Sequence, residues 1–169
     1  MARDLLGCQV WVRHDGEPAH TGRIVEVEAA RGFDDRACHG WRGETPRLRS
    51  LFGPGGRTFV YITYGIHHML NVVTEEAGHP SGVLTRALDP LRNLPDPARG
   101  PGLLTRALGI TLAQNGSDLR RGAMRVLEGG LKAGEEVGPS TRVGVEYSGR
   151  SAELVAARMR QSRENRRRN

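Results

Sequence analysis

Residues 58–71 read Thr58-Phe-Val-Tyr-Ile-Thr-Tyr-Gly-Ile-His-His-Met-Leu-Asn71. Two runs rich in apolar, β-branched and aromatic residues, 58–63 and 69–74, flank the segment 64–68, which contains Gly65. Such runs on either side of a short glycine-containing connection are typical of two antiparallel strands. The stretch therefore predicts a β-hairpin with Tyr64 at its tip.

Further apolar or alternating runs, bounded by turn residues, recur on both sides of this hairpin. They predict strands over 8–13, 23–29, 82–88, 123–128 and 141–146. The run 103–108, which Gly109 ends, predicts a short helix, while 30–56 and 89–101 read as a long polar loop and a proline-rich linker. Many short strands with few helices favour an α+β fold: a single domain with a curved, barrel-like antiparallel sheet, a protruding hairpin and a few peripheral helices.

The basic charge of the chain is concentrated at its C-terminal end. The formal net charge is +6 over 169 residues, and residues 150–169 hold seven arginines and two glutamates, which is a local +5. We therefore expect a domain over 1–149 and an arginine-rich tail over 150–169. The tail is interpreted either as a solvated, partly disordered terminus or as a non-specific phosphate-binding arm.

Several function classes are disfavoured by composition. No stretch approaches the roughly 20 apolar residues of a membrane span, and no leader pattern opens the chain, so we expect a cytoplasmic protein. Cys8 and Cys38 lack the paired spacing of a zinc or redox site, and the six histidines are scattered, so no metal or other cofactor is expected. Lys132 is the single lysine, which disfavours Schiff-base chemistry.

Glu28 is the first candidate for chemistry. It ends a predicted strand that opens into the long loop, a common position for catalytic groups. Strict alternation places Ile24, Glu26 and Glu28 on one face of that strand, so the two carboxylates could act as an acid and a base. The alternative is that both are solvent-facing strand residues.

Other candidates lie in the long loop and the hairpin. His39 could serve a binding site, or it could be a hydrogen-bonded structural histidine. Thr45, Arg47 and Arg49 could bind phosphate oxygens, or they could be solvated loop residues. Alternation places Tyr61 and Tyr64 on opposite faces, so that one lines a pocket while the other projects from the tip; a core tyrosine with a turn tyrosine is the alternative.

Taken together, these residues resemble the alkyladenine (3-methyladenine) DNA glycosylase family of base-excision repair. The resemblance covers about residues 2–146 in ordered blocks, each of which would be weak alone. The blocks are Ala2-Arg-Asp-Leu-Leu-Gly7, Gly22-Arg-Ile-Val-Glu-Val-Glu28-Ala, Asp35-x-Ala-x-His39, Thr45-Pro-Arg47, Leu51-Phe52, Val60-Tyr61-Ile-Thr-Tyr64-Gly, Asn71-Val, Val83-Leu-x-Arg86-Ala-Leu-x-Pro90-Leu, Gly100-Pro101, Ala107-Leu-Gly-Ile110 and Arg142-Val143-Gly-Val145.

The resemblance implies a role for each matching residue. Glu28 would be the general base that activates water, and Arg86 and the carbonyl of Val143 would help to hold that water. The base pocket would comprise His39, Tyr61, Asn71 and the residue at position 30, and the wedge inserted into DNA would comprise Tyr64, Ile66 and His67. The family also implies hydrolysis of alkylated or deaminated purines in duplex DNA without lyase activity. The arginine-rich, lysine-poor composition suggests a bacterial source, and we expect a cytoplasmic monomer.

Three departures from the family pattern are visible. Ala30 stands where the family has a tyrosine, Leu103 stands where it has a lysine, and the closing aromatic strand expected after Val145 is absent. These changes keep open a non-catalytic nucleic-acid-binding module of the same fold. A metal-dependent hydrolase built on the scattered histidines is a third reading, which the spacing does not support.

Overall fold

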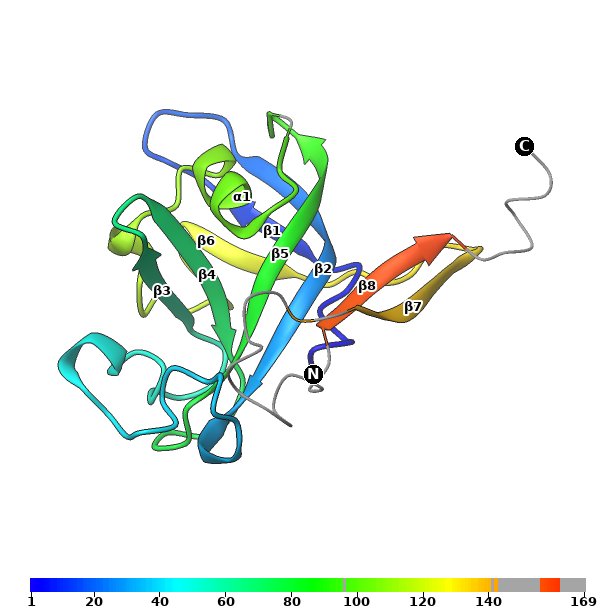
Figure 1. Ribbon diagram of the computed structural model, residues 1–169. Helices are drawn as coiled ribbons and strands as arrows, with labels where there is room; N and C mark the ends of the chain where they lie inside the picture. Colours follow the sequence, from blue (N-terminus) through cyan, green and yellow to red (C-terminus); the bar gives the residue numbers. More distant parts are fainter. Residues whose placement is uncertain (96, 141, 143–155, 162–169) are drawn as a thin grey trace.

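The described residues form one antiparallel sheet of eight strands (Figure 1). This computed structural model describes residues 1–95, 97–140, 142 and 156–161. Six strands are neighbours in the order β3-β4-β5-β2-β1-β6, and β8 pairs with both β2 and β7. The strands are β1 Gln9–Val12, β2 His20–Arg31, β3 Thr58–Thr63, β4 His67–Val73, β5 Ser81–Arg92, β6 Met124–Leu127, β7 Glu135–Ser140 and β8 Ala156–Gln161; the helix α1 is Pro101–Ala107, and short 3-10 turns span Gly32–Asp34, Pro46–Leu48 and Leu112–Gln114.

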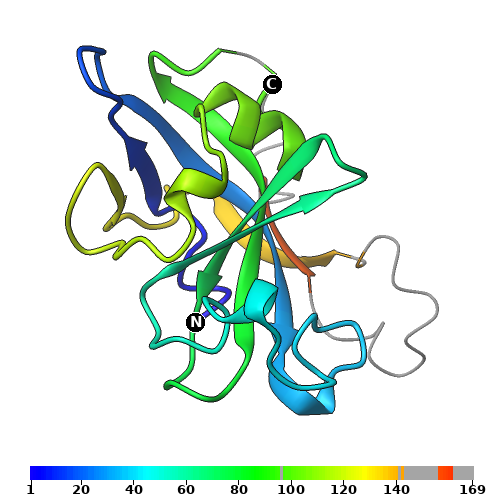
Figure 2. The same cartoon turned by 90° about the vertical axis from the view of Figure 1, so that its left-hand side faces the viewer.

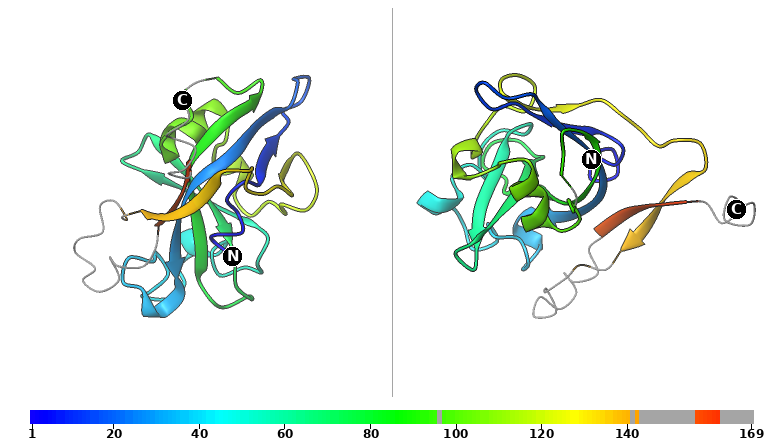
Figure 3. Two further views of the ribbon diagram at one scale, coloured as in Figure 1. Left: turned by 90° about the vertical axis from the view of Figure 1, so that its right-hand side faces the viewer. Right: turned by 90° about the horizontal axis from the view of Figure 1, so that it is seen from above.

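The predicted hairpin is present. β3 has the predicted bounds, and β4 begins two residues earlier than predicted because His67 and His68 pair with Thr63 and Ile62. The hairpin projects beyond the neighbouring strands (Figure 2). The expected α+β domain with a curved antiparallel sheet is confirmed, and the curl is clearest from above (Figure 3).

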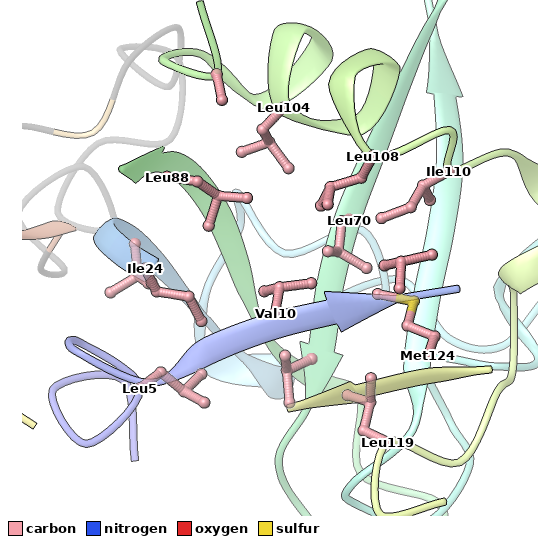
Figure 4. Close-up of a cluster of buried hydrophobic side chains, with 14 of the residues drawn as sticks. Leu5, Val10, Ile24, Leu70, Leu88, Leu104, Leu108, Ile110, Leu119 and Met124 are labelled. Atoms are coloured by element: carbon pink, nitrogen blue, oxygen red, sulfur yellow. The ribbon is translucent and has the colours of Figure 1, made fainter. Parts of the chain in front are cut away.

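One face of the sheet carries the main hydrophobic core. Alternate residues of β3, β4 and β5 point to this face, and α1 packs on β4 and β5 and completes it (Figure 4). Burial of this apolar surface is the main source of the fold's stability, at about 25 cal/mol per Å². The larger side chains include Leu5, Val10, Ile24, Leu70, Leu88, Leu104, Leu108, Ile110, Leu119 and Met124.

The opposite face of β3 and β4 is covered by the long loop between β2 and β3. Cys38, Leu48, Leu51 and Phe52 of the loop pack on Phe59 and Val73 and form a second, smaller cluster. Ala30, Trp41 and Tyr61 lie against this cluster and are partly buried. The loop is therefore anchored on a hydrophobic platform, which gives fixed positions to the polar side chains between its anchor points.

Irregular pairing between β2 and β5 corrects the expected alternation on β2. Ile24 pairs with Leu88, Glu26 with Ala87 and Val27 with Thr85, which leaves Val25 and Arg86 as extra residues in the two strands. Bulges of this kind re-aim side chains and are common beside active sites. As a result, Ile24 and Val27 both point into the core. Strict alternation predicts that Ile24 shares a face with Glu28, and the structure shows that it does not.

The C-terminal part of the sheet differs from the expectations in several places. β5 continues to Arg92, into the segment that reads as a linker, and β7 was not expected because Gly138 and Pro139 weaken its strand pattern. Six residues of the basic segment form β8, which pairs with Glu26–Glu28 of β2. In Figure 3, β7 and β8 extend away from the curl. Of the strand expected over 141–146, all but Arg142 lies outside the described residues, and the domain boundary at residue 149 stays a prediction.

Candidate functional site

Glu28 lies near the end of β2 with its carboxylate engaged on both oxygens. The residue is 7% exposed. Arg86 Nη1 donates to Glu28 Oε2 at 2.7 Å, and Arg86 Nε lies 3.6 Å from Glu26 Oε1. The bulge at Arg86 directs its side chain to the face that carries both carboxylates. The predicted proximity of Glu28 and Arg86 is therefore present, and Arg86 joins the two glutamates.

Arg142 engages the other oxygen of Glu28. Its Nε donates to Glu28 Oε1 at 3.2 Å, and its Nη1 donates to Asp35 Oδ2 at 3.0 Å. The Arg142 side chain is 2% exposed and Asp35 is fully buried. Sequence reasoning did not select either residue, although both lie in the family-like blocks: Arg142 directly precedes Val143, and Asp35 lies four residues before His39.

An aromatic group lies on the same face of the sheet. Glu28, Leu84, Asn71 and Phe59 pair successively across β2, β5, β4 and β3, so they form one cross-strand row on one face. Tyr61, two residues beyond Phe59 on β3, has the same facing. The sheet therefore places the carboxylate and the aromatic rings on a common surface.

His39 packs on this aromatic group. Its ring centroid lies 4.3 Å from that of Tyr61 and 6.2 Å from that of Phe59, while Phe59 and Tyr61 stack at 5.3 Å. The residue as a whole is exposed, and its contacts with the two rings shield the imidazole only in part. This desolvation, and secondly the positive charge of Arg47, lowers the pKa of His39 below its ordinary 6.5. The ring is therefore neutral at pH 7.

Asn71 and Ala30 complete this surface. Asn71 is buried, and its Nδ2 donates to the carbonyl oxygens of Phe59 at 3.1 Å and Met69 at 3.3 Å, so the orientation of the amide is fixed. Ala30 lies two residues after Glu28 on β2, so it points to the same face of the sheet, and it is half-buried. Its side chain is a single methyl group, so position 30 itself supplies no aromatic ring.

The hairpin tip exposes three candidate residues. Tyr64 is 91% exposed and Ile66 is 72% exposed, and His67 is exposed beside them. The backbone of Tyr64 has φ of 52°, and Gly65 follows with φ of 73°. Ile66 N donates to Thr63 O at 3.3 Å, which closes the turn. The structure thus presents large apolar and aromatic side chains at the tip of a projecting element.

The predicted phosphate-binding residues lie in the loop beside this hairpin. Thr45, Arg47 and Arg49 are exposed, and Arg47 Nη2 donates to Ile62 O of β3 at 2.8 Å. Two arginines that sequence reasoning did not select add to this surface. Arg42 and Arg36 lie 4.7 and 5.9 Å from the ring centroid of Trp41, at a pocket of about 430 Å³ that His39 also lines. A paired Trp–Arg sequence next to His39 was the available signal.

Some expectations receive no structural test. Val143 lies outside the described residues, so its carbonyl is not placed. Within the part of the chain that the structure describes, no three histidine, cysteine, aspartate or glutamate side chains are grouped as metal ligands would be. Over the same residues, no helix has the length and apolar character needed to span a membrane.

The chain matches known proteins along most of its length. Residues 1–161 match the family model described as Methylpurine-DNA glycosylase (MPG). A protein of Legionella pneumophila (strain Corby) that bears the name "Putative 3-methyladenine DNA glycosylase" is 42% identical over 148 residues, which cover 88% of this chain and 80% of that protein. Proteins with the same name from Myxococcus xanthus (strain DK1622) and Anaeromyxobacter dehalogenans (strain 2CP-C) are 42% identical over 151 residues and 46% identical over 150 residues. Both alignments cover 88% of this chain, and they cover 77% and 72% of those proteins.

Proposed function

This chain belongs to the methylpurine-DNA glycosylase family, and from that membership we propose that it hydrolyses the N-glycosidic bond of alkylated or deaminated purines. The target nucleotide is flipped out of duplex DNA, and the product is an abasic site. The observation that carries the proposal is the placement of Glu28. A nearly buried carboxylate, held by two guanidinium groups, shares one sheet face with a cluster of aromatic rings.

The hairpin tip supplies the wedge that nucleotide flipping needs. A base inside a duplex cannot reach a protein pocket, and extrusion costs a few kcal/mol, less for a damaged pair. Tyr64, with Ile66 and His67, enters the minor groove and fills the space that the nucleotide vacates. Thr45, Arg47 and Arg49 bind the flanking phosphates, where their exposure leaves their donors accessible.

The flipped purine stacks on Tyr61 and His39. Stacking of a base on an aromatic ring contributes roughly 1–3 kcal/mol. Because the His39 ring is neutral at pH 7, it adds no positive charge against an alkylated purine that is itself cationic. Asn71, whose amide is held by two backbone carbonyls, screens the purine edges that can enter.

Glu28 performs the chemical step with water. Cleavage of the glycosidic bond gives an oxocarbenium-like sugar, and the carboxylate stabilises this positive charge while it accepts a proton from the attacking water. The Glu28 carboxylate is oriented by Arg86, and the carbonyl of Val143 is proposed to help hold the water. An alkylated purine leaves readily because it carries a positive charge. Lys132 is the single lysine of the chain and is exposed on the segment that leads into β7. We propose that it forms no Schiff base with the sugar and that the enzyme has no lyase activity.

Ala30 favours a second candidate function. Without an aromatic ring at this position the flipped base lacks one stacking partner, and a protein of this fold could bind nucleic acid without turnover. The two candidates differ in one property, the release of a free base. We further propose that the protein acts as a monomer in the cytoplasm, on bacterial chromosomal DNA.

Duplex oligonucleotides with one hypoxanthine, ethenoadenine or 7-methylguanine, and an undamaged duplex as control, test the proposal. The released base is identified by mass, and the strand is examined before and after alkali. We expect a free purine, an intact strand, and a break only after alkali treatment. Tight binding of the damaged duplexes without any free base would support the binding module instead.

A further inference from the structure

The buried ion pairs continue beyond the residues assigned to the reaction. Arg142 lies between two carboxylates: its Nε donates to Glu28 at 3.2 Å and its Nη1 donates to Asp35 at 3.0 Å. Because Arg86 donates to the second oxygen of Glu28 at 2.7 Å, both oxygens of that carboxylate are restrained. The plane of the carboxylate is therefore fixed from two sides.

Asp35 also fixes the loop that carries His39. Its Oδ1 accepts from Ala37 N at 2.9 Å, and its Oδ2 accepts from Arg31 N at 3.1 Å. Arg31 ends β2, three residues after Glu28, and Ala37 precedes His39 by two residues. One carboxylate thus joins the end of the catalytic strand, the loop of the base pocket and the guanidinium that contacts Glu28.

Stability alone is a weak reason for such an arrangement. Removing paired charges from water costs about as much as their attraction returns, and well-packed apolar residues are often equally stable. The Asp35 side chain is fully buried, and the Arg142 side chain is nearly so. By contrast, a functional group must be held within roughly 0.5 Å of its productive geometry by partners that are themselves fixed.

We propose that Asp35 and Arg142 are positioning residues, which hold the Glu28 carboxylate in register with the base pocket formed by His39 and Tyr61. This inference rests on the proposed glycosylase function. Neither residue touches the substrate; Asp35 acts through Arg142 on the carboxylate and through Ala37 on the loop. Misplacement of a reacting group by about 1 Å can lower a rate by about 100-fold.

Two variants separate positioning from charge. Arg142→Lys keeps the positive charge, but a single ammonium group lacks the fork that bridges two carboxylates. Asp35→Asn keeps the shape of the side chain, but the amide NH2 group would place a donor against the Arg142 donor. The matched control is Glu135→Gln, which removes a largely buried ion pair (2.7 Å) between Glu135 of β7 and Arg23; Arg23 lies on β2, the strand that carries Glu28. Arg23 lies five residues from Glu28 along β2, roughly 16 Å at about 3.3 Å per residue.

The measurements are the single-turnover rate constant of base release, the Kd for a duplex with an uncleavable abasic analogue, and Tm. We expect release to be about 10- to 100-fold slower in Arg142→Lys and Asp35→Asn, with Kd unchanged within about twofold. Glu135→Gln should lower Tm and leave the release rate unchanged. If Asp35→Asn does not fold, Arg142→Lys decides.

Two results would overturn the inference. The first is base release at the wild-type rate by the folded variants. The second is a fall in the release rate of Arg142→Lys that parallels its losses of Tm and DNA affinity, together with an equal fall in the release rate of Glu135→Gln. In both cases wild-type release shows that the glycosylase proposal itself stands. Absence of release from every damaged duplex by the wild-type protein would instead overturn the proposed function, and the inference with it.

Discussion

Replacement of Tyr64 by asparagine should stabilise the protein while it lowers activity. The two central residues of the hairpin turn, Tyr64 and Gly65, have φ of 52° and 73°. Positive φ at both positions is the signature of a type I′ turn, for which Asn-Gly is the favoured pair. A tyrosine at the first position is strained, and strain of this kind is found where function requires the side chain.

The magnitude follows from the conformation and the exposure of Tyr64. The left-handed region costs an ordinary residue about 1–2 kcal/mol, and asparagine adopts it more readily. Because Tyr64 is 91% exposed, about one tenth of a tyrosine's roughly 200 Å² is buried, and its loss costs about 0.5 kcal/mol. The net gain should be about 0.5–1 kcal/mol, which raises Tm by about 1–4 °C for a domain of this size.

Thermal unfolding and base release are to be measured together on Tyr64→Asn and on the control Ile66→Asn. Ile66 is 72% exposed at the same tip, and its φ is not positive, so its replacement should not raise Tm. Base release by Tyr64→Asn should fall about fivefold or more, because stacking by the wedge is worth roughly 1–3 kcal/mol. A lower Tm in Tyr64→Asn, or an equal rise in Ile66→Asn, would refute the strain argument; unchanged release would refute the wedge.

Three further predictions concern stability and substrate binding. The Arg23 guanidinium lowers the pKa of Glu135 to about 2. This pair should therefore contribute about 1–3 kcal/mol to the free energy of unfolding above pH 4.5 and lose that contribution as the pH falls toward 2. In urea unfolding, the free energy of unfolding of Glu135→Gln should fall less steeply with acid than that of wild type, and equal slopes would contradict this. In Gly40→Ala the added methyl group would overlap the ring of Pro80, so the loop should shift and base release should fall more than affinity for undamaged DNA; preserved release would show that the loop adapts. Ala30→Tyr should strengthen binding of a hypoxanthine duplex by about tenfold relative to undamaged duplex, through roughly 1–3 kcal/mol of stacking, and an unchanged ratio of the two Kd values would place the aromatic partner elsewhere.

Local patterns predicted the hairpin and much of the sheet. The bounds of β3 follow directly from the run of β-branched and aromatic residues over 58–63, and the position of Glu28 on a strand near Arg86 follows from the family-like blocks. Long-range pairing could not be predicted in the same way. Bulges at Val25 and Arg86 depend on how two strands meet, so strict alternation placed Ile24 on the wrong face.

The buried part of the candidate site was also hidden from sequence reasoning. Asp35 and Arg142 are 107 residues apart, and neither lies in a pattern that would indicate an ion pair. β7 and β8 were missed because Gly138 and Pro139 weaken one strand and the run of arginines obscures the other. The exposed candidates were easier, because the exposure of Tyr64 and Arg47 follows from their places in a turn and a polar loop.

The most direct test of the account is base release by wild type, Glu28→Gln and Glu26→Gln from a duplex with one hypoxanthine or alkylated purine, in the presence of EDTA. Both glutamates lie within reach of Arg86, at 2.7 and 3.6 Å, so the two variants disturb the same guanidinium. We predict release by wild type, retention of most of it in Glu26→Gln, and a loss of about 100-fold or more in Glu28→Gln. Release by Glu28→Gln at the wild-type rate, or release that EDTA abolishes, would contradict the account.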